Sequence, residues 1–430
     1  MVRRQTEKTQ MLRFLVGFFV QTIPGVMLTP MLALSMAARG VDAALIGALV
    51  AVGSLAYMAA LPAAPALLRR LGERRTFRLA LVMCALATIG LTLSDSPALW
   101  AALLALSGLA AGLRYTVAES WVPALASDET RGQSVALFQT SIGAGFFVGS
   151  GMLMLVGIYG LAPRAVILAT TLAAVALLWP MRAPTLAAAP TPTRARAGLR
   201  GAVAQVGPLV LGAALLGGLF ESGLSVALPL YGLVAGLSPT LAAGLVTAMG
   251  LGSLAQYPFG YLADRLPWTR VVLGAAGLIV ASALLLPLAQ AWPALLLLLG
   301  LIWGSAGGGL YTLATIRNGE LWRGSQLVGA SIVTQLAYMI GDAVGPALGG
   351  LAIDLAPQLG LPALVAGVGV TILAVMLWTV QQQTVDGGRW TVSTTRDTAT
   401  HPGDIAGRMQ RPEPTPVGAK HGPEIGGICG

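Results

Sequence analysis

Four ionisable side chains stand within long apolar stretches of the sequence: the acids Glu119, Glu221 and Asp342 and the base Arg114. A charged side chain at the centre of a bilayer costs about 2.5–3.5 kcal/mol on insertion scales. We therefore expect these groups to face a cavity, to pair with one another, or to stay protonated. Carboxyl groups in that setting can carry protons or bind substrate, and an arginine can hold an anion or a carboxylate.

A structural role is the alternative for each of these groups. Glu221 could lock neighbouring helices together, and Asp342, which lies in a glycine-rich segment, could cap a neighbouring backbone. Glu119 could anchor an inner gate. Arg114 could be a structural charge, or one that snorkels towards the membrane surface.

Uncharged polar side chains accompany these charges at helical spacing. Gln335, Tyr338 and Asp342 are three and then four residues apart, and Tyr115 and Glu119 are four apart. Each set therefore lies along one face of a helix. We expect these polar side chains to line a substrate cavity, with satisfied packing contacts as the alternative. The uncharged cavity candidates are Tyr115, Gln139, Tyr311, Gln335 and Tyr338.

Membrane-spanning helices must position these side chains, because the composition excludes an ordinary soluble protein. Of the 430 residues, 56% are hydrophobic and 10% are charged, whereas about a quarter of a soluble domain is charged. A spanning helix needs about 20 apolar residues, since lipid offers the backbone no hydrogen-bond partners. We predict an all-α polytopic membrane protein of about twelve spans; several runs touch, so eleven or thirteen stay open. The predicted spans are 11–37, 43–68, 76–94, 97–125, 132–159, 162–181, 205–233, 239–263, 270–290, 293–316, 325–352 and 358–381.

The basic residues predict how these spans are oriented. Lys and Arg collect in cytoplasmic loops. With the N-terminus inside, the outer loops hold only Arg39 and Arg164. Both termini are then cytoplasmic, in a protein that we expect in a bacterial inner membrane. The net charge of +9 follows from the same asymmetry, so no nucleic-acid partner is needed to explain it.

Composition divides the chain into a cytoplasmic N-terminus (1–10), a six-helix half (11–181), a linker (182–204), a second six-helix half (205–381) and a tail (382–430). The linker is rich in Pro, Ala and Arg, which is typical of a flexible segment. The tail has little apolar content and mixed charges, so we expect it to be disordered and cytoplasmic.

The two halves repeat short phrases in the same order. Gly53-Ser54-Leu55-Ala56 recurs as Gly252-Ser253-Leu254-Ala255, and Arg70-Leu71 recurs as Arg265-Leu266. Both halves begin on the inside, so they are predicted to be parallel repeats related by an axis along the membrane normal. Such folds bind substrate near mid-membrane between the halves and rock one half against the other.

With this duplication, the sequence resembles the major facilitator superfamily. The signature loop after the second span of the second half reads Gly260-Tyr261-Leu262-Ala263-Asp264-Arg265, with Arg270 following. In the first half, Pro65 and Arg69 replace the Gly and the Asp of this pattern. The resemblance implies a cytoplasmic gate latched by charge pairs, with solvated loop charges as the alternative. The implied gate residues are Gly260, Asp264, Arg265, Arg270, Arg70 and Arg74.

A closer resemblance is to the YcaD-type branch of this superfamily. It is carried by the segments 115–121 (YTVAESW), 228–231 (LPLY) and 255–260 (AQYPFG). In the superfamily the first, fourth, seventh and tenth spans line the transport path. The resemblance therefore implies that Glu119 and Glu221 are lining residues.

Several classes of function lack the residues they would need. No His or Lys lies within a predicted span, so a proton relay would have to use carboxylates. The chain has no glycine-lysine phosphate loop that would indicate ATP use. It has no Cys/His cluster and no Ser/His/Asp set in the apolar core. We therefore expect no enzyme activity, no catalytic residue, no cofactor and no metal.

We predict a secondary active transporter that moves a small solute by alternating access, coupled to protons and leaning to efflux. Its expected partners are a small-molecule substrate, protons and the lipid bilayer, and we expect a monomer. One alternative is uptake of an organic anion, a sugar or a metal chelate, with Arg114 binding the anion. A second is a membrane scaffold or lipid-handling protein that does not transport and that recruits partners through the tail.

Overall fold

The structure is a computed structural model in which residues 1–381 form one compact unit. Most of the predicted linker and almost all of the predicted tail lie outside the described residues. Helix α7 (Leu199–Val206) overlaps the C-terminal end of that linker. The described residues are 2–94, 96–125, 131–182, 199–322 and 324–385.

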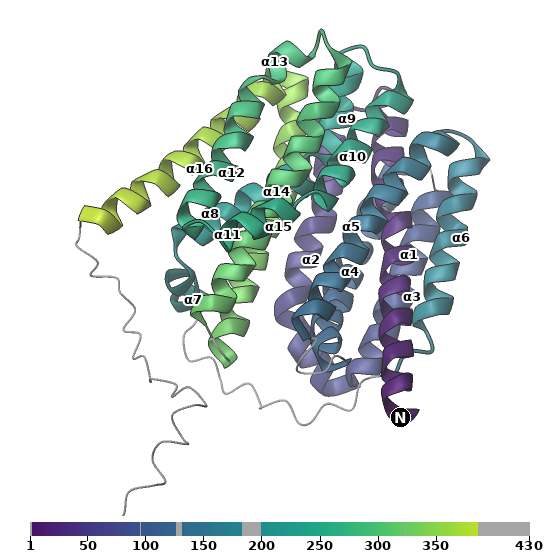
Figure 1. Cartoon of the computed structure of the whole chain (residues 1–430). Coiled ribbons are helices and arrows are strands. Elements are labelled where there is room, and N and C mark those ends of the chain that lie inside the picture. The colour runs from purple at the N-terminus through teal and green to yellow at the C-terminus, as the bar shows by residue number, and fades with distance from the viewer. Residues whose placement is uncertain (1, 95, 126–130, 183–198, 323, 386–430) are drawn as a thin grey trace, which may run out of the picture. The chain divides into compact units, whose positions relative to one another are not determined.

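The first half consists of six long helices (Figure 1). Five of them begin and end within a few residues of the predicted spans, and α1 begins well before its predicted span. The helices are α1 (Val2–Ala38), α2 (Ala43–Leu71), α3 (Glu73–Leu93), α4 (Pro97–Leu125), α5 (Arg131–Val156) and α6 (Leu161–Leu178).

The second half has the same order of spans but is more interrupted. Its seventh span is built from α8 (Pro208–Gly217), the π-helical segment η1 (Gly218–Gly223) and α9 (Leu224–Val234). The eighth is α10 (Pro239–Leu254) with α11 (Tyr257–Ala263), and the ninth is α12 (Trp268–Leu284) with α13 (Leu286–Ala289). The last three are α14 (Pro293–Leu321), α15 (Gly324–Leu355) and α16 (Gly360–Val385).

Ten helical stretches in the described residues are long and apolar enough to cross a membrane. The eighth and ninth spans are the two shorter ones, because both are broken near one end. Together these twelve spans make an all-α polytopic membrane protein, as the sequence predicts.

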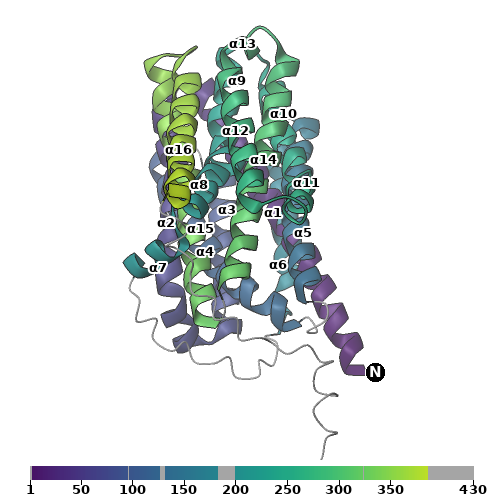
Figure 2. The same cartoon turned by 60° about the vertical axis from the view of Figure 1, so that its left-hand side comes forward.

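The two halves pack their helices in the same pairs. In the first half α1 packs on α5, and both α2 and α3 pack on α4. In the second half η1 and its flanking helices pack on α15, and both α10 and α12 pack on α14. Figure 2, which brings the second half forward, shows α12 and α14 side by side.

Glycine allows close approaches of equivalent helices in each half. A Cβ on Gly108 of α4 would overlap the backbone carbonyl of Gly53 in α2. A Cβ on Gly304 of α14 would overlap the carbonyl of Met249 in α10, the equivalent pair of spans. Small residues let spanning helices gain van der Waals contact in a solvent that gives no hydrophobic drive between them.

The eighth span is broken where one continuous helix was predicted, between α10 and α11. Pro258 has no N–H and cannot donate the next helical bond, so the carbonyl groups of the preceding turn need other donors. The hydroxyl of Ser305 in α14 donates to the carbonyl of Ala255 over 2.7 Å. That bond matters because an unsatisfied backbone group in a membrane costs several kcal/mol.

The most extensive contacts between the halves are those of α2 with α15 and of α5 with α10, and α1 also contacts α9. Close contacts run from the end of the bundle that carries the α1–α2 turn towards its middle. Near that end, a Cβ on Gly47 would overlap the carbonyl of Pro346. In the second pair, a Cβ on Gly250 would lie 3.0 Å from the Cα of Phe147. We call this end the α1–α2 end, and the opposite one the α2–α3 end.

Candidate functional site

Glu221 lies in the π-helical segment η1, between α14 and α15. Two glycines make room for it: a Cβ on Gly307 would lie 2.8 Å from the Glu221 nitrogen, and one on Gly308 would lie 2.7 Å from its Oε1. On the other side, the Tyr338 hydroxyl donates to Glu221 Oε2 over 3.1 Å. Ser253 of α10 also hydrogen-bonds this carboxylate. Short π-helical segments inside α-helices are frequent at functional sites.

Asp342 of α15 joins the two halves. The hydroxyl of Ser54, in α2 of the first half, donates to Asp342 Oδ2 over 2.5 Å. The side chain of Ser222, in η1 of the second half, hydrogen-bonds the same carboxylate. One carboxylate is therefore held from both sides of the interface, and Glu221 lies next to Ser222 in the chain.

Gln335 makes a second polar contact across the interface. Its Nε2 donates to the hydroxyl of Tyr57 in α2 over 2.9 Å. Gln335 and Asp342 both lie on α15, and their hydrogen bonds tie the middle of α15 to α2. The polar residues along this face of the eleventh span therefore contact other polar groups. Tyr338 points to Glu221, and Gln335 and Asp342 point to α2.

Tyr311 of α14 completes the cluster on the second half. Its ring lies 4.6 Å from that of Tyr338, measured between centroids. The hydroxyl of the next residue, Thr312, donates to Gln256 Oε1 over 2.8 Å. A Cβ on Gly308 would also lie 3.1 Å from that Gln256 oxygen. We call Glu221, Asp342, Tyr338, Tyr311 and Ser253 the acid cluster.

Arg114 lies apart from the acid cluster, inside the first half. Its side chain is buried, at 6% exposure, and its guanidinium lies 5.3 Å from the ring of Tyr115 and 5.5 Å from that of Phe18. One terminal nitrogen donates to Cys84 Sγ over 3.6 Å. Within the described part of the chain, Arg114 Nε has no hydrogen-bond partner and no carboxylate pairs with this side chain. Tyr115 in turn lies 6.2 Å from the ring of Tyr57.

Two further residues that were predicted to line the cavity, Glu119 and Gln139, lie in α4 and α5 of the first half. Glu119 lies in α4, but its side chain is not among those described. Gln139 is an exposed residue of α5. One turn further along that helix, Gly143 faces Leu254 of α10, so Gln139 lies on the side of α5 that meets the second half.

The signature loop of the second half lies between α11 and α12, at the α2–α3 end. Asp264, Arg265 and Arg270 are all exposed, while Gly260 is half-buried. The guanidinium of Arg265 lies over the ring of Tyr261 at 3.9 Å. Among the residues that the structure describes, Asp264 makes no ion pair.

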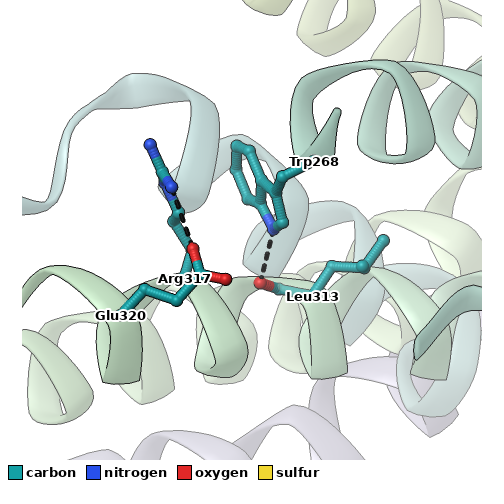
Figure 3. A network of polar contacts seen from close by, with 4 residues as sticks. All are labelled: Trp268, Leu313, Arg317 and Glu320. Atoms are coloured by element: carbon teal, nitrogen blue, oxygen red, sulfur yellow. Dashed lines mark hydrogen bonds and ion pairs between the residues drawn. The ribbon is translucent and has the colours of Figure 1, made fainter. Parts of the chain in front are cut away.

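The helix after this loop is fixed to α14 (Figure 3). Trp268 Nε1 donates to the carbonyl of Leu313 over 2.8 Å. Arg317 lies 5.4 Å from the Trp268 ring and pairs with Glu320 over 2.9 Å. These contacts hold the first residue of α12 against α14, directly after the loop. In the first half, Arg70 and Arg74 flank the α2–α3 turn and are exposed.

The predicted outer-loop arginines lie at the opposite end of the bundle. Arg39 and Arg164 line one cavity of about 180 Å³, together with Trp100. This cavity lies in the first half at the α1–α2 end, away from the acid cluster.

Sequence reasoning did not single out the serines that hold the acids. Ser54 and Ser253 occupy the same place in the repeated Gly-Ser-Leu-Ala phrase, and each hydrogen-bonds one of the two acids. The repeat was therefore the signal for both serines. What it could not show is that Ser54 bonds an acid of the other half, whereas Ser253 bonds one of its own.

Comparison with known proteins decides the family. A family model described as Major Facilitator Superfamily matches residues 14–341. The chain belongs to the major facilitator superfamily. It is thus a multi-pass membrane protein of the superfamily's transporter type, and its fold is the all-α major-facilitator fold of two six-helix halves.

Relatives within the superfamily are similar over most of their length. The uncharacterized MFS-type transporter YfkF of Bacillus subtilis (strain 168) is 24% identical over 329 residues, covering 75% of this chain and 83% of the relative. An uncharacterized MFS-type transporter of Yersinia pestis (strain Pestoides F) is 26% identical over 325 residues, covering 72% and 80%.

Solved structures of transporters share the fold. A D-xylose-proton symporter superposes with a TM-score of 0.68 at 16% identity, covering 86% of this chain and 96% of that one. The nucleoside transporter NupG superposes with a TM-score of 0.67 at 12% identity, covering 86% and 99%. At these identities the likeness shows the fold and not the substrate.

Proposed function

We propose that this superfamily member is a proton-coupled secondary transporter that exports a small solute across a bacterial inner membrane by alternating access. The observation that carries the proposal is the carboxylate of Asp342, which is bonded at once to Ser54 of one half and to Ser222 of the other. A group held in this way responds to any movement between the halves.

The proposed coupling is a thermodynamic linkage. When the halves separate at the α1–α2 end, the Ser54 hydroxyl leaves Asp342, and the carboxyl group meets a different environment. Proton binding at Asp342 and the position of the halves then change one another's equilibrium by the same factor. No coupling pathway between distant sites is needed, because the titrating group, Asp342, lies in the interface itself.

Glu221 has a different role in this proposal. Its hydrogen-bond partners Tyr338 and Ser253 belong to its own half, so the carboxylate moves with that half as a rigid group. It is half-buried rather than sealed and can meet a solute entering between the halves. We assign it to binding a proton or a cationic group of the substrate. Tyr311, Gln335, Tyr115 and Gln139 are proposed as polar contacts of the same path.

The topology and gate are proposed on the sequence pattern. Both termini are assigned to the cytoplasm, the halves to residues 11–181 and 205–381, and the α2–α3 end to the cytoplasmic side. The exposed loop with Asp264 and Arg265 is the proposed gate, joined by Gly260 and Arg270. Labelling of single cysteines in intact cells checks this: Arg164→Cys should react with an impermeant reagent, and Arg74→Cys should react only after lysis. The reverse pattern would invert the orientation.

The export direction and the YcaD-type branch rest on resemblance. Segments 115–121, 228–231 and 255–260 support the branch. Direction is tested by comparing right-side-out with everted vesicles under an imposed proton gradient. Export predicts solute accumulation in the everted vesicles when their interior is acidic. Accumulation in right-side-out vesicles with an acidic exterior would reverse the direction.

The coupling is tested in proteoliposomes, with a solute first identified by thermal-shift screening of the purified protein. Glu221→Gln, Asp342→Asn and Glu119→Gln should each abolish flux driven by the pH gradient, and in Asp342→Asn and Glu119→Gln the solute should still raise the melting temperature. Glu320→Gln is the matched control, because Glu320 is an exposed acid paired with Arg317. If all three variants keep wild-type coupling, these acids do not carry protons.

Uptake of an organic anion, a sugar or a metal chelate is the second candidate, and Arg114 favours the anion. A buried guanidinium with no carboxylate partner among the described residues has unmet capacity for a negative group. Counterflow with labelled solutes separates the candidates. Arg114→Ala should raise the half-saturation concentration for an anion and leave that for a cation unchanged. Equal effects on both would make Arg114 a structural charge.

The third candidate is a scaffold or lipid-handling role that depends on the tail. Deleting residues 386–430 distinguishes it from transport. Under the transport proposal, gradient-driven flux survives the deletion. Loss of function with normal folding and normal solute binding would favour the scaffold.

A further inference from the structure

The N-terminus of α2 is capped by a residue of the other half. Asp354, in the last turn of α15, accepts the Ala43 N–H on Oδ1 over 3.0 Å and the Ala44 N–H on Oδ2 over 2.7 Å. The first N–H groups of a helix have no partner within the helix, and the helix dipole favours a negative charge at this end. Asp354 therefore supplies what α2 lacks, and it does so across the interface between the halves.

A local cap is present but unused. Asp42 occupies the N-cap position of α2, yet its side chain makes no capping hydrogen bond. Aspartate is among the strongest N-cap residues, and Asp42 is exposed. Its carboxylate can therefore turn to the free N–H groups of α2 whenever Asp354 is withdrawn.

The equivalent helix of the second half is capped in the ordinary way. Helix α10 starts the second span of that half, as α2 does in the first. Its N-cap is Ser238, whose hydroxyl oxygen accepts the Leu241 N–H over 3.3 Å. The repeat thus contains one helix start that depends on the opposite half and one that does not.

The backbones of α2 and α15 touch where Asp354 acts. Gly350 lies four residues before Asp354 on α15, and a Cβ there would overlap the carbonyl of Ala43. One turn into α2, a Cβ on Gly47 would overlap the carbonyl of Pro346. Because the contact is backbone to backbone, the halves cannot separate at this end without drawing Asp354 away from α2.

We propose that Asp354 and Asp42 alternate as the N-terminal cap of α2, and that this exchange sets the balance between the closed and open states of the α1–α2 end. Asp354 is the latch of the closed state. Asp42 takes over in the open state, so that opening does not leave the N–H groups unpaired. The proposal rests on the alternating access proposed above, and it assigns Asp354 a positioning role in that cycle.

Opposite shifts from the two aspartates are the signature of such an exchange. Losing an N-cap changes an equilibrium by roughly two- to thirtyfold. Asp354→Ala removes the cap of the closed state and should raise the open-to-closed ratio within that range. Asp42→Ala removes the cap of the open state and should lower the ratio. Asp354→Asn keeps one acceptor oxygen and should fall between Asp354→Ala and the wild type.

The ratio is measured by the distance between spin labels in the full-length protein in lipid nanodiscs. Labels on Leu155→Cys and Leu288→Cys report the α1–α2 end, since both residues are exposed and lie on different halves. Ser238→Ala is the control: it should lower the melting temperature but leave the ratio unchanged, because its cap lies within one half. Folding of each variant is checked by circular dichroism and size-exclusion chromatography.

The outcomes separate the latch from the transport cycle. If the wild type samples two distances and both aspartate variants shift the ratio the same way, or not at all, the exchange is wrong while alternating access stands. The exchange also fails if Ser238→Ala shifts the ratio as strongly as Asp354→Ala does. If the wild type shows one distance at every pH, alternating access fails, and the exchange fails with it.

Discussion

The hydrogen bond between Ser54 and Asp342 joins the two halves, so Ser54→Ala should weaken the closed state at the α1–α2 end. The bond is 2.5 Å long and involves residues 288 positions apart in the sequence. Hydrogen bonds to charged groups contribute about 1.5–3 kcal/mol in soluble proteins. Measured values between membrane helices average about 0.6 and reach about 1.7 kcal/mol.

The values measured between membrane helices are the ones to use here, because both residues lie in spanning helices. In Ser54→Ala the Asp342 carboxylate also keeps its hydrogen bond to Ser222, so the group is not left without a partner. Since 1.4 kcal/mol corresponds to a factor of ten, the open-to-closed ratio should rise by about three- to twentyfold. Spin labels at positions 155 and 288 measure this ratio directly, with Cys429 replaced and the buried Cys84 left in place.

Ser253→Ala is the matched control, since Ser253 has the same place in the repeated phrase but bonds Glu221 of its own half. It should leave the ratio unchanged and affect only proton or solute binding. An unaltered ratio in Ser54→Ala would refute the reasoning. An equal shift in both serine variants would do so too, because the effect would then not depend on a bond across the interface.

Three further predictions follow from the packing around the acid cluster and the loop. Gly308→Ala should fold normally but displace the Glu221 carboxylate, whose Oε1 lies 2.7 Å from the new Cβ, so gradient-driven flux should fall while the melting temperature holds. Gly108→Val should overlap a backbone carbonyl of α2 and destabilise the fold by at least about 1–3 kcal/mol, seen as a lower melting temperature in detergent; an unchanged value would contradict the packing. Trp268→Phe removes one bond to α14, worth about 1 kcal/mol, and should speed proteolysis of the α11–α12 loop with little change in global stability.

Much of the fold can be predicted from the sequence, because apolar length is set by the bilayer. The fourth span was predicted at 97–125, and α4 covers Pro97–Leu125. The internal repeat likewise predicts that both halves use the same helix pairs. Breaks within a span are harder to predict. Pro258 interrupts the eighth span, and the break is tolerated because a serine of α14 donates to a carbonyl group that the break frees. That contact cannot be predicted from the local sequence.

The candidate site is only partly predictable, for a physical reason. Helical spacing predicted that Tyr338 and Asp342 share a face of α15, and their neighbours in the structure are the polar groups of α2 and η1. Which residues meet them depends on how the halves dock, and that involves contacts hundreds of residues apart. Asp354 was missed for the same reason: it lies beyond the predicted span 325–352, and its partners are 310 and 311 residues away.

Under the proposed mechanism the two halves rock about the acid cluster, and protons drive the movement. The most direct test measures two label distances in nanodiscs as the pH is stepped, one at the α1–α2 end (Leu155 and Leu288) and one at the α2–α3 end (Leu71 and Leu321). We expect one distance to grow as the other shrinks, and the double variant Glu221→Gln, Asp342→Asn to lose this pH response. Distances that stay fixed, that change in the same direction, or that respond equally in the double variant would contradict it.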